Sequence, residues 1–236
     1  MHLFFLAKIA ENKAFLDEDD ARHCIKVLRK KPGEPIDGVD GEGNYYRGII
    51  ESLGKDLLVM RIEEKIAGWG ENDKEIICGI SLLHKVDRFE WFIEKSVELG
   101  VTCIRPFISD RTVKLNIRPE RIQKILISAL KQCKRSRTPE FQAPVPFEDL
   151  VQEFKTESIP KLIPFCNAEK KLGSMESEIR KSQKVLFLIG PEGDFTQEEI
   201  DSATACGFKP VSLGTTIMRT ETAALHMLSV IRYLQS

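Results

Sequence analysis

Two short glycine-containing loops, one helix apart, hold the residues whose types could do chemistry. The first reads Gly-Pro-Glu-Gly at residues 190–193 and follows the apolar run 184–190, and the second starts at Gly214. Neither phosphate-binding pattern, G-x-x-x-x-G-K-S/T or G-x-G-x-x-G, is present. A loop with a fixed proline and bare glycines can instead present backbone N–H and C=O groups to a neutral ring edge such as adenine. The alternative is a structural tight turn.

Three side chains of these loops are candidates for acid–base work. Glu192 and Glu221 could each act as a general base, and Arg219 could stabilise a negative charge that develops during a reaction. A structural role stays open for each of them. Thr220 is a candidate N-cap, and Glu221 in the first turn of the last helix suits the helix dipole. Glu192 could face solvent, and Arg219 could pair with a carboxylate.

Both loops belong to a part of the chain in which apolar strand runs alternate with helices. This alternation predicts an α/β fold with a mostly parallel sheet covered by helices on both faces. The expected strands are 75–83, 101–108, 161–167, 184–190 and 208–214, and the expected helices are 88–100, 118–133, one from about Gln197 and one from about Glu221. The segments 155–161 and 175–184 are expected to be connections. Because the glycine loops follow strands, they lie at the strands' carboxyl ends, where open α/β sheets bind ligands.

Helix boundaries in this part carry their own signals. Thr196 with Glu199 three residues later predicts a capping box, so a helix begins at Gln197. Gly207 is expected to end that helix, as Gly100 ends the helix before it in the chain.

The first 70 residues have a different composition. After an opening helical piece, turn pairs such as Pro-Gly and Asp-Gly separate short alternating runs, and 56–66 is a further strand candidate. These features predict a small β-barrel. The polar, glycine-containing segment 67–74 is the best linker, so we expect two domains, 1–70 and 74–236.

Composition excludes several classes of protein. The 236 residues include 35 Lys and Arg against 36 Asp and Glu, so a nucleic-acid partner would need local basic patches. The six cysteines are scattered without a C-x-x-C pair and the four histidines lie far apart, which predicts reduced thiols and no metal site. No run approaches the length of a membrane span, and the start lacks the features of a signal peptide, so we expect a cytoplasmic protein.

Two local basic patches could supply phosphate contacts. The first lies within 118–137 and the second within 22–31, and we expect them on different domains, where they could clamp a structured RNA. A solvated helix face is the alternative for the first patch, and His23 in the second is a packing or capping residue rather than a catalyst. The expected RNA contacts are Arg22, Lys26, Arg29, Lys134, Arg135 and Arg137.

Four separated motifs, in order, carry a family resemblance that covers nearly all of the chain. "IGPEGDFTQEEI" followed by "VSLGTTIMRTETAA" resembles the paired signatures of the SPOUT class of S-adenosylmethionine-dependent RNA methyltransferases, and more narrowly of the RsmE family. Residues 16–50, with "HCIKVLR", are similar to that family's N-terminal segment. "KVDRFEWFIEKSVELGV" and "ALKQCKRSRTP" fit its central motifs.

The resemblance implies a fold and an activity. It implies a PUA-like β-barrel, a methyltransferase domain with a deep trefoil knot, a homodimer whose partner chain helps build each active site, and methylation of uridine N3 in 16S ribosomal RNA. The base must then be unpaired or turned out of its stack, and Arg219 could steady the uracil anion or pair with a carboxylate at the dimer contact. The implied S-adenosylmethionine site comprises Leu188, Gly190, Pro191, Glu192, Gly193, Leu213, Gly214, Ile217, Met218, Thr220 and Ala223.

The chain departs from the family pattern at four positions. Asp194 stands where a second glycine is usual, Thr216 where arginine is usual, Met218 where leucine is usual, and Lys131 where glutamate is common. Two alternative functions stay open. One is a SPOUT enzyme that acts on another RNA position, such as a ribose 2′-hydroxyl, although the "HCIKVLR" block argues against it. The other is a non-catalytic ribosome-assembly factor with the same fold.

Overall fold

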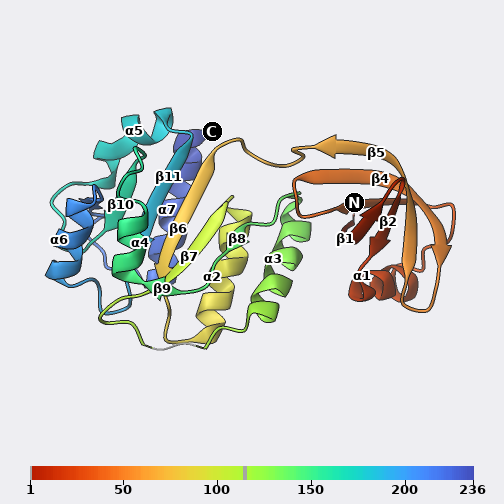
Figure 1. The fold of residues 1–236 in the computed structure, drawn as a ribbon, viewed down its shortest axis with the longest axis horizontal. Coiled ribbons are helices and arrows are strands. Elements are labelled where there is room, and N and C mark those ends of the chain that lie inside the picture. Colours follow the sequence, from red (N-terminus) through yellow and green to blue (C-terminus); the bar gives the residue numbers. More distant parts are fainter. Residues whose placement is uncertain (1, 114–115) are drawn as a thin grey trace. The chain divides into compact units, whose positions relative to one another are not determined.

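The structure is a computed structural model that describes residues 2–113 and 116–236. The chain forms two compact units (Figure 1). One unit comprises Met1–Asn72 with Gln123–Thr138, and the other comprises Asp73–Ile122 with Pro139–Ser236. The change of unit at Asn72 falls inside the expected linker 67–74. Residues 123–138 group with the N-terminal unit, which the pattern of the sequence did not indicate.

The N-terminal unit contains a closed five-stranded barrel, as predicted. The strand order is β1-β2-β5-β4-β3, and every neighbouring pair is antiparallel except β1 with β3. The strands are β1 (Leu3–Ala10), β2 (Lys13–Leu16), β3 (Pro35–Val39), β4 (Asn44–Leu53) and β5 (Leu58–Ala67). The expected opening helical piece is wrong, because residues 3–10 are a strand whose Leu3, Phe4 and Leu6 are buried. A short apolar run of this kind does not distinguish a strand from a buried helix.

Helical structure follows β2 instead. Helix α1 (Glu18–Arg22) begins at Asp17, whose side chain accepts a hydrogen bond from the Asp20 N–H, and continues into a π-helical turn, η1 (His23–Val27). The Asp20 carboxylate also accepts hydrogen bonds from the Phe5 N–H at 2.7 Å and from the Lys131 ammonium at 2.6 Å. Lys131, one of the departures from the family pattern, is thus half of an ion pair within the N-terminal unit.

A single carboxylate holds the segment after helix α3 (Pro119–Cys133) in the same unit. Glu71 accepts hydrogen bonds from the backbone N–H groups of Ser136 and Arg137, both at 2.8 Å, and from the Arg135 guanidinium at 2.9 Å. Arg135 is buried, with 7% of its surface exposed. A mostly buried carboxylate with this many donors is well satisfied. These bonds, with the Lys131–Asp20 pair, explain why residues 123–138 belong with the barrel.

The C-terminal unit contains the predicted parallel sheet. Its order is β12-β10-β11-β6-β7-β8, with β9 also paired to β7, and all of these pairs are parallel. The strands are β6 (Glu75–Ser81), β7 (Cys103–Ile108), β8 (Glu140–Phe141), β9 (Val145–Pro146), β10 (Lys161–Pro164), β11 (Lys184–Ile189) and β12 (Lys209–Val211). The five expected strands are confirmed. The two-residue strands β8 and β9 were not foreseen.

Helices cover both faces of this sheet (Figure 1). Helix α7 (Thr220–Gln235) contacts β6 and β11 and packs against α2 (Val86–Glu98) and α5 (Glu176–Lys181). Helices α4 (Phe147–Glu153) and α6 (Gln197–Ala205) pack on each other, and their apolar side chains cluster with the other face of β11. The expectation that 175–184 is only a connection is wrong, because α5 lies within it. No helix among the described residues is long and apolar enough to cross a membrane.

Three of the expected helix boundaries in this unit are confirmed. Thr196 and Glu199 form both hydrogen bonds of a capping box at the start of α6. Gly100 after α2 and Gly207 after α6 have φ angles of +84° and +87°, a left-handed conformation that glycine adopts without strain. The trefoil knot stays a prediction.

A buried lysine joins the ends of two helices to the start of β10. The Lys161 ammonium, in a residue with 5% of its surface exposed, donates hydrogen bonds to the backbone carbonyls of Phe154, Lys155 and Cys206 at 2.9, 3.2 and 2.9 Å. Phe154 and Cys206 are the C-caps of α4 and α6. Because the last carbonyls of a helix lack partners within it, the ammonium satisfies groups that would otherwise be buried and unpaired.

Candidate functional site

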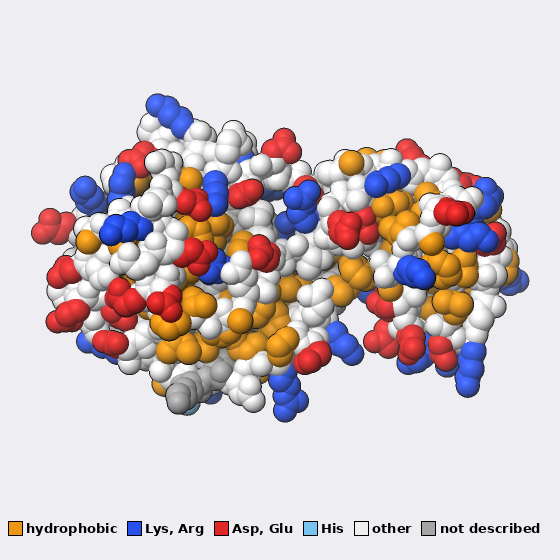
Figure 2. Space-filling view, in the orientation of Figure 1, with side chains coloured by type: hydrophobic (Ala, Val, Ile, Leu, Met, Phe, Trp, Pro, Cys, Tyr) orange, Lys and Arg blue, Asp and Glu red, His pale blue; other side chains and the backbone are white. Residues whose placement is uncertain are grey.

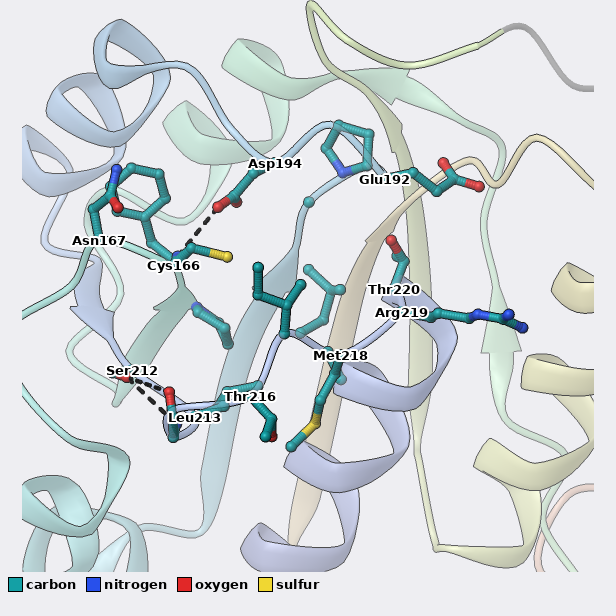
Figure 3. A pocket seen from close by; sticks show the side chains of 18 of the residues that line it. Cys166, Asn167, Glu192, Asp194, Ser212, Leu213, Thr216, Met218, Arg219 and Thr220 are labelled. Atoms are coloured by element: carbon teal, nitrogen blue, oxygen red, sulfur yellow. Dashed lines mark hydrogen bonds between the residues drawn. The ribbon is translucent and has the colours of Figure 1, made fainter.

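The two glycine loops line one cavity of about 500 Å³ at the carboxyl ends of β10, β11 and β12 (Figure 3). Most of the residues expected to hold a cofactor lie on its wall. They are Gly190, Pro191, Glu192, Leu213, Gly214, Ile217, Met218, Thr220 and Ala223. The sheet brings the loops together because β11 and β12 both neighbour β10 and run in the same direction. A cavity of this size falls in the range of small-molecule sites, about 300–1,000 Å³.

Two expected cofactor residues are absent from the wall. The Leu188 side chain is fully buried in the core cluster beneath the cavity. The Gly193 carbonyl accepts a hydrogen bond of 2.6 Å from the Arg111 guanidinium, and the Arg111 side chain covers the position that a Gly193 Cβ would occupy. A cofactor role for Leu188 and Gly193 stays a prediction.

The structure explains why position 190 requires glycine even in the absence of a ligand. A Cβ added at Gly190 would lie 2.9 Å from the ring of Phe195, which is a much closer approach than carbon atoms normally make. The Phe195 ring is buried and packs against Phe107 and Phe147. Gly214 has a different reason, because its φ of +133° lies in a region that side chains with a Cβ rarely adopt.

The segment 190–199 is bonded to the loops that follow three other strands. Glu192 accepts a hydrogen bond from the His84 N–H after β6 at 3.1 Å, and Glu199 accepts one from the Asp110 N–H after β7 at 3.0 Å. Asp194 accepts one from the Cys166 N–H after β10 at 3.1 Å. We call residues 190–199 the hub loop. Its acidic side chains fix the positions of the neighbouring loops around the cavity.

Asp194 itself has a left-handed backbone, with a φ of +59°. Aspartate is one of the few residues other than glycine that tolerate this conformation, because its short polar side chain can bond locally. Its two carboxylate oxygens accept hydrogen bonds from the Cys166 N–H and from the Phe195 N–H, the latter at 2.9 Å. The backbone geometry accounts for the usual glycine at this position of the family and for the ability of aspartate to replace it.

The end of β10 and the loop that follows it form a wall of the cavity that sequence reasoning missed. Pro164, Phe165, Cys166 and Asn167 line it, together with Ile189, Asp194, Ser212, Thr215 and Thr216. Hydrogen bonding to Asp194, with burial as a second cause, raises the pKa of the Cys166 thiol to about 11, so the thiol is protonated at neutral pH. The missing signal was the strand order. Once β10 is placed between β11 and β12, its following loop must face the same edge of the sheet.

The candidate catalytic side chains separate into two sets. Glu192 and Arg219 line the cavity and are exposed, and in Figure 3 their side chains extend toward the same side, away from Cys166 and Asp194. Arg219 is the N-cap of α7 without a capping side-chain bond, so the expectation that Thr220 is the N-cap is wrong. Thr220 is the first helical residue.

Glu221 has a different environment. Its side chain is buried, and one carboxylate oxygen lies 3.8 Å from the Arg88 Nε of helix α2. The other oxygen, Oε2, is buried without a hydrogen-bond partner among the described residues. Glu221 is absent from the cavity wall. The structure therefore brings together Glu192 and Arg219, and it places Glu221 against a neighbouring helix.

Both basic patches contribute to the N-terminal unit, whereas the sequence predicted that they lie on different domains. The bonds of Glu71 to Arg135, Ser136 and Arg137 are the physical reason. Buried Arg135 is held by its carboxylate partner and is poorly placed to reach a phosphate. The other expected contacts, Arg22, Lys26, Arg29, Lys134 and Arg137, are exposed. On the face drawn in Figure 2, basic and acidic side chains are interspersed.

Comparisons with known proteins agree with this architecture. The family model of an RNA methyltransferase domain matches residues 70–232, and that of an RNA methyltransferase PUA domain matches residues 16–63. Ribosomal RNA small subunit methyltransferase E of Mesomycoplasma hyopneumoniae is 30% identical over 234 residues, which are 97% of this chain and 98% of that protein. The Bacillus subtilis protein of the same name is 28% identical over 91% of this chain and 88% of its own length.

A solved structure extends the likeness to three dimensions. The ribosomal RNA small subunit methyltransferase E from Neisseria gonorrhoeae, bound to S-adenosyl methionine, has a TM-score of 0.86 and 32% identity, covering 99% of this chain and 98% of that chain. The fold of nearly the whole chain, the barrel and the parallel sheet included, is thus shared with that relative. On these grounds the chain belongs to the ribosomal RNA small subunit methyltransferase E family of RNA methyltransferases.

Proposed function

We propose that this chain transfers the methyl group of S-adenosylmethionine to N3 of a uridine in the 16S RNA of the small ribosomal subunit. The observation that carries the proposal is the convergence of the two glycine loops on one cavity of about 500 Å³, in a fold whose relative from Neisseria gonorrhoeae is bound to S-adenosyl methionine. When bound, S-adenosylmethionine supplies an electrophilic methyl group, so the protein's task is positioning, exclusion of water and management of one proton.

The wall residues suit the parts of such a cofactor. Backbone groups of the Gly190–Gly193 and Gly214 segments can bond the edge of adenine, and Leu213, Ile217 and Met218 offer apolar surface to its ring. Together with Pro191, Glu192, Thr220 and Ala223, these residues are the proposed cofactor site. The described residues contain no group of three or more His, Cys, Asp or Glu side chains that could hold a metal ion, and we propose that none is used.

Glu192 is the proposed general base and Arg219 the proposed stabiliser of negative charge. Uracil N3 carries a proton that must leave before the nitrogen can form a bond to the methyl carbon. Glu192 uses one oxygen to accept the His84 N–H, which leaves Oε2 to take that proton. Arg219 has no hydrogen bond or ion pair recorded among the described residues, so its guanidinium is available to the uracil anion. Glu221, buried beside Arg88, is the weaker candidate.

RNA would be held mainly by the N-terminal unit. Its exposed Arg22, Lys26, Arg29, Lys134 and Arg137 can contact phosphates, which position a substrate without reading its sequence. We also propose a homodimer that acts in the cytoplasm. Ile217 on the cavity wall and Trp91 on α2 are large apolar side chains with 88% and 47% of their surface exposed, as expected of residues that meet a second chain.

The decisive experiment offers the protein labelled S-adenosylmethionine and either small ribosomal subunits or naked small-subunit RNA from cells that lack the enzyme. Digestion and mass spectrometry then identify the labelled nucleoside. We expect label in N3-methyluridine. Label in a 2′-O-methylated nucleoside would move the chain to another activity of the SPOUT class. No label, with no cofactor binding by calorimetry, would leave the non-catalytic assembly factor.

Variants separate the two candidate bases. Glu192→Gln keeps an oxygen for the His84 N–H but cannot take a proton, so we expect turnover at saturating cofactor to fall by about 10²–10⁴-fold, a much larger effect than any change in cofactor affinity. Glu221→Gln should retain turnover, because its carboxyl is off the cavity wall. The reverse result would assign the base to Glu221.

A further inference from the structure

The charged groups on the cavity wall are unevenly distributed. Two carboxylates, Glu192 and Asp194, and one cation, Arg219, line it. Figure 3 shows Arg219 extending away from Asp194, whose carboxylate faces Cys166. No ion pair of Asp194 is recorded among the described residues, and the Cys166 thiol beside it is protonated at neutral pH. The nearby Arg111 guanidinium donates to the carbonyl of the preceding residue, Gly193, and forms no ion pair with Asp194. The part of the cavity around Asp194 therefore carries a carboxylate that is not paired with a cation among the described residues.

The fold does not require this charge. Asp194 uses its oxygens as acceptors for the Cys166 and Phe195 N–H groups, and the side-chain oxygen of asparagine could accept in the same way. Its left-handed backbone suits glycine or asparagine equally well. What aspartate adds beyond those residues is a full negative charge on the cavity wall.

We propose that Asp194 is a specificity-determining residue that makes the cavity prefer a cationic adenosyl ligand to a neutral one. The inference rests on the proposed function. Methyl transfer breaks the bond between sulfur and the methyl carbon as the bond from the target nitrogen forms, and the sulfonium cation becomes a neutral thioether. S-adenosylmethionine and its demethylated product, S-adenosylhomocysteine, thus differ by one positive charge and one methyl group. A fixed carboxylate attracts S-adenosylmethionine more strongly and favours release of S-adenosylhomocysteine.

The size of the preference follows from the position of the carboxylate. Asp194 is partly exposed, so its attraction for a cation in the cavity is weakened by water and by salt. A preference on the order of tenfold in the ratio of dissociation constants is reasonable for two unit charges near a protein surface.

Calorimetry on the full-length protein tests the proposal with S-adenosylmethionine and S-adenosylhomocysteine as the two ligands. In Asp194→Asn we expect the dissociation constant of S-adenosylmethionine to rise about tenfold and that of S-adenosylhomocysteine to change less than about twofold. Asp194→Gly should act in the same direction. The matched control is Glu198→Gln, which removes an exposed carboxylate from the first turn of α6, off the cavity wall. It should leave both affinities unchanged.

Two further readouts separate charge from shape. Added salt should reduce the wild-type preference and leave that of Asp194→Asn nearly constant. In turnover assays Asp194→Asn should be inhibited at a lower ratio of S-adenosylhomocysteine to S-adenosylmethionine than the wild-type protein. Equal weakening of both ligands would mean that Asp194 only shapes the loop, and unchanged affinities would mean that its charge does nothing; either result overturns the proposal. Wild-type protein that binds neither ligand would instead overturn the proposed function, and the preference with it.

Discussion

The contact between Gly190 and Phe195 permits a sharp test of why the hub loop begins with glycine. Gly190→Ala places a methyl group 2.9 Å from the Phe195 ring, whereas carbon atoms are normally about 3.5–4.0 Å apart. The ring cannot retreat easily, because it is buried against Phe107 and Phe147. Overpacking of this kind costs about 1–3 kcal/mol of stability. We expect a loss of that size, accompanied by weaker cofactor binding.

A second substitution distinguishes internal packing from contact with a ligand. Phe195→Leu removes the part of the ring that Gly190→Ala would meet, so the double variant should be more stable than the sum of the single effects predicts, by about 1–2 kcal/mol. Urea denaturation measures the free energies of unfolding, and calorimetry measures S-adenosylmethionine binding. Gly173→Ala is the control, because a Cβ there meets nothing within 4 Å.

The refuting result is additivity. If the two substitutions add, Phe195 is not what excludes a side chain at position 190. If stability is rescued in the double variant and cofactor affinity is not, then the bare backbone of Gly190 is needed by the ligand as well as by Phe195.

Three further predictions concern other parts of the chain. Lys161→Met should lower the free energy of unfolding by about 2–5 kcal/mol in urea denaturation, because it leaves buried carbonyls at two helix ends without a hydrogen-bond donor. Lys181→Met, at an exposed position, is the control and should change the free energy of unfolding little. Arg137→Ala should weaken RNA binding and reduce the slope of log affinity against log salt concentration by about 1, with no loss of cofactor affinity. An unchanged slope would show that Arg137 does not contact an RNA phosphate. Cys166 should react slowly with iodoacetamide at pH 8, because its thiolate forms only near its pKa of about 11, and Asp194→Asn should lower that pKa and speed the reaction, as followed by mass spectrometry. Equal rates in both proteins would show that Asp194 does not control the thiol.

Sequence patterns were most informative where the determining interactions are local. The capping box of Thr196 and Glu199 lies within four residues of chain, and Gly100 and Gly207 mark helix ends through their own backbone conformations. Five strands of the parallel sheet were predicted because short apolar runs that alternate with helices are typical of buried strands in a parallel sheet.

Long-range pairing determines what the patterns missed. Nothing near Ser136 in the chain indicates that Glu71, 65 residues away, holds its backbone. Cys166 and its neighbours reached the cavity wall only through the placement of β10 between β11 and β12. The opening strand was mistaken for a helix because its pairing partners, β2 and β3, lie further along the chain.

The hub loop bonds its neighbours through its own side chains and their backbone, which has a consequence for how sequences of the family can vary. In three of its bonds to neighbouring loops, the hub loop provides a carboxylate and the neighbour provides a backbone N–H, at His84, Asp110 and Cys166. Any residue except proline can supply that N–H. The side chains at these three positions can therefore change, and with them the surface offered to RNA or cofactor, while the backbone bonds that position the loops are kept. The Arg111 side chain, which bonds the Gly193 carbonyl, does not share this freedom. Substitutions at these three positions can therefore alter substrate preference without loss of the hydrogen bonds that position the loops.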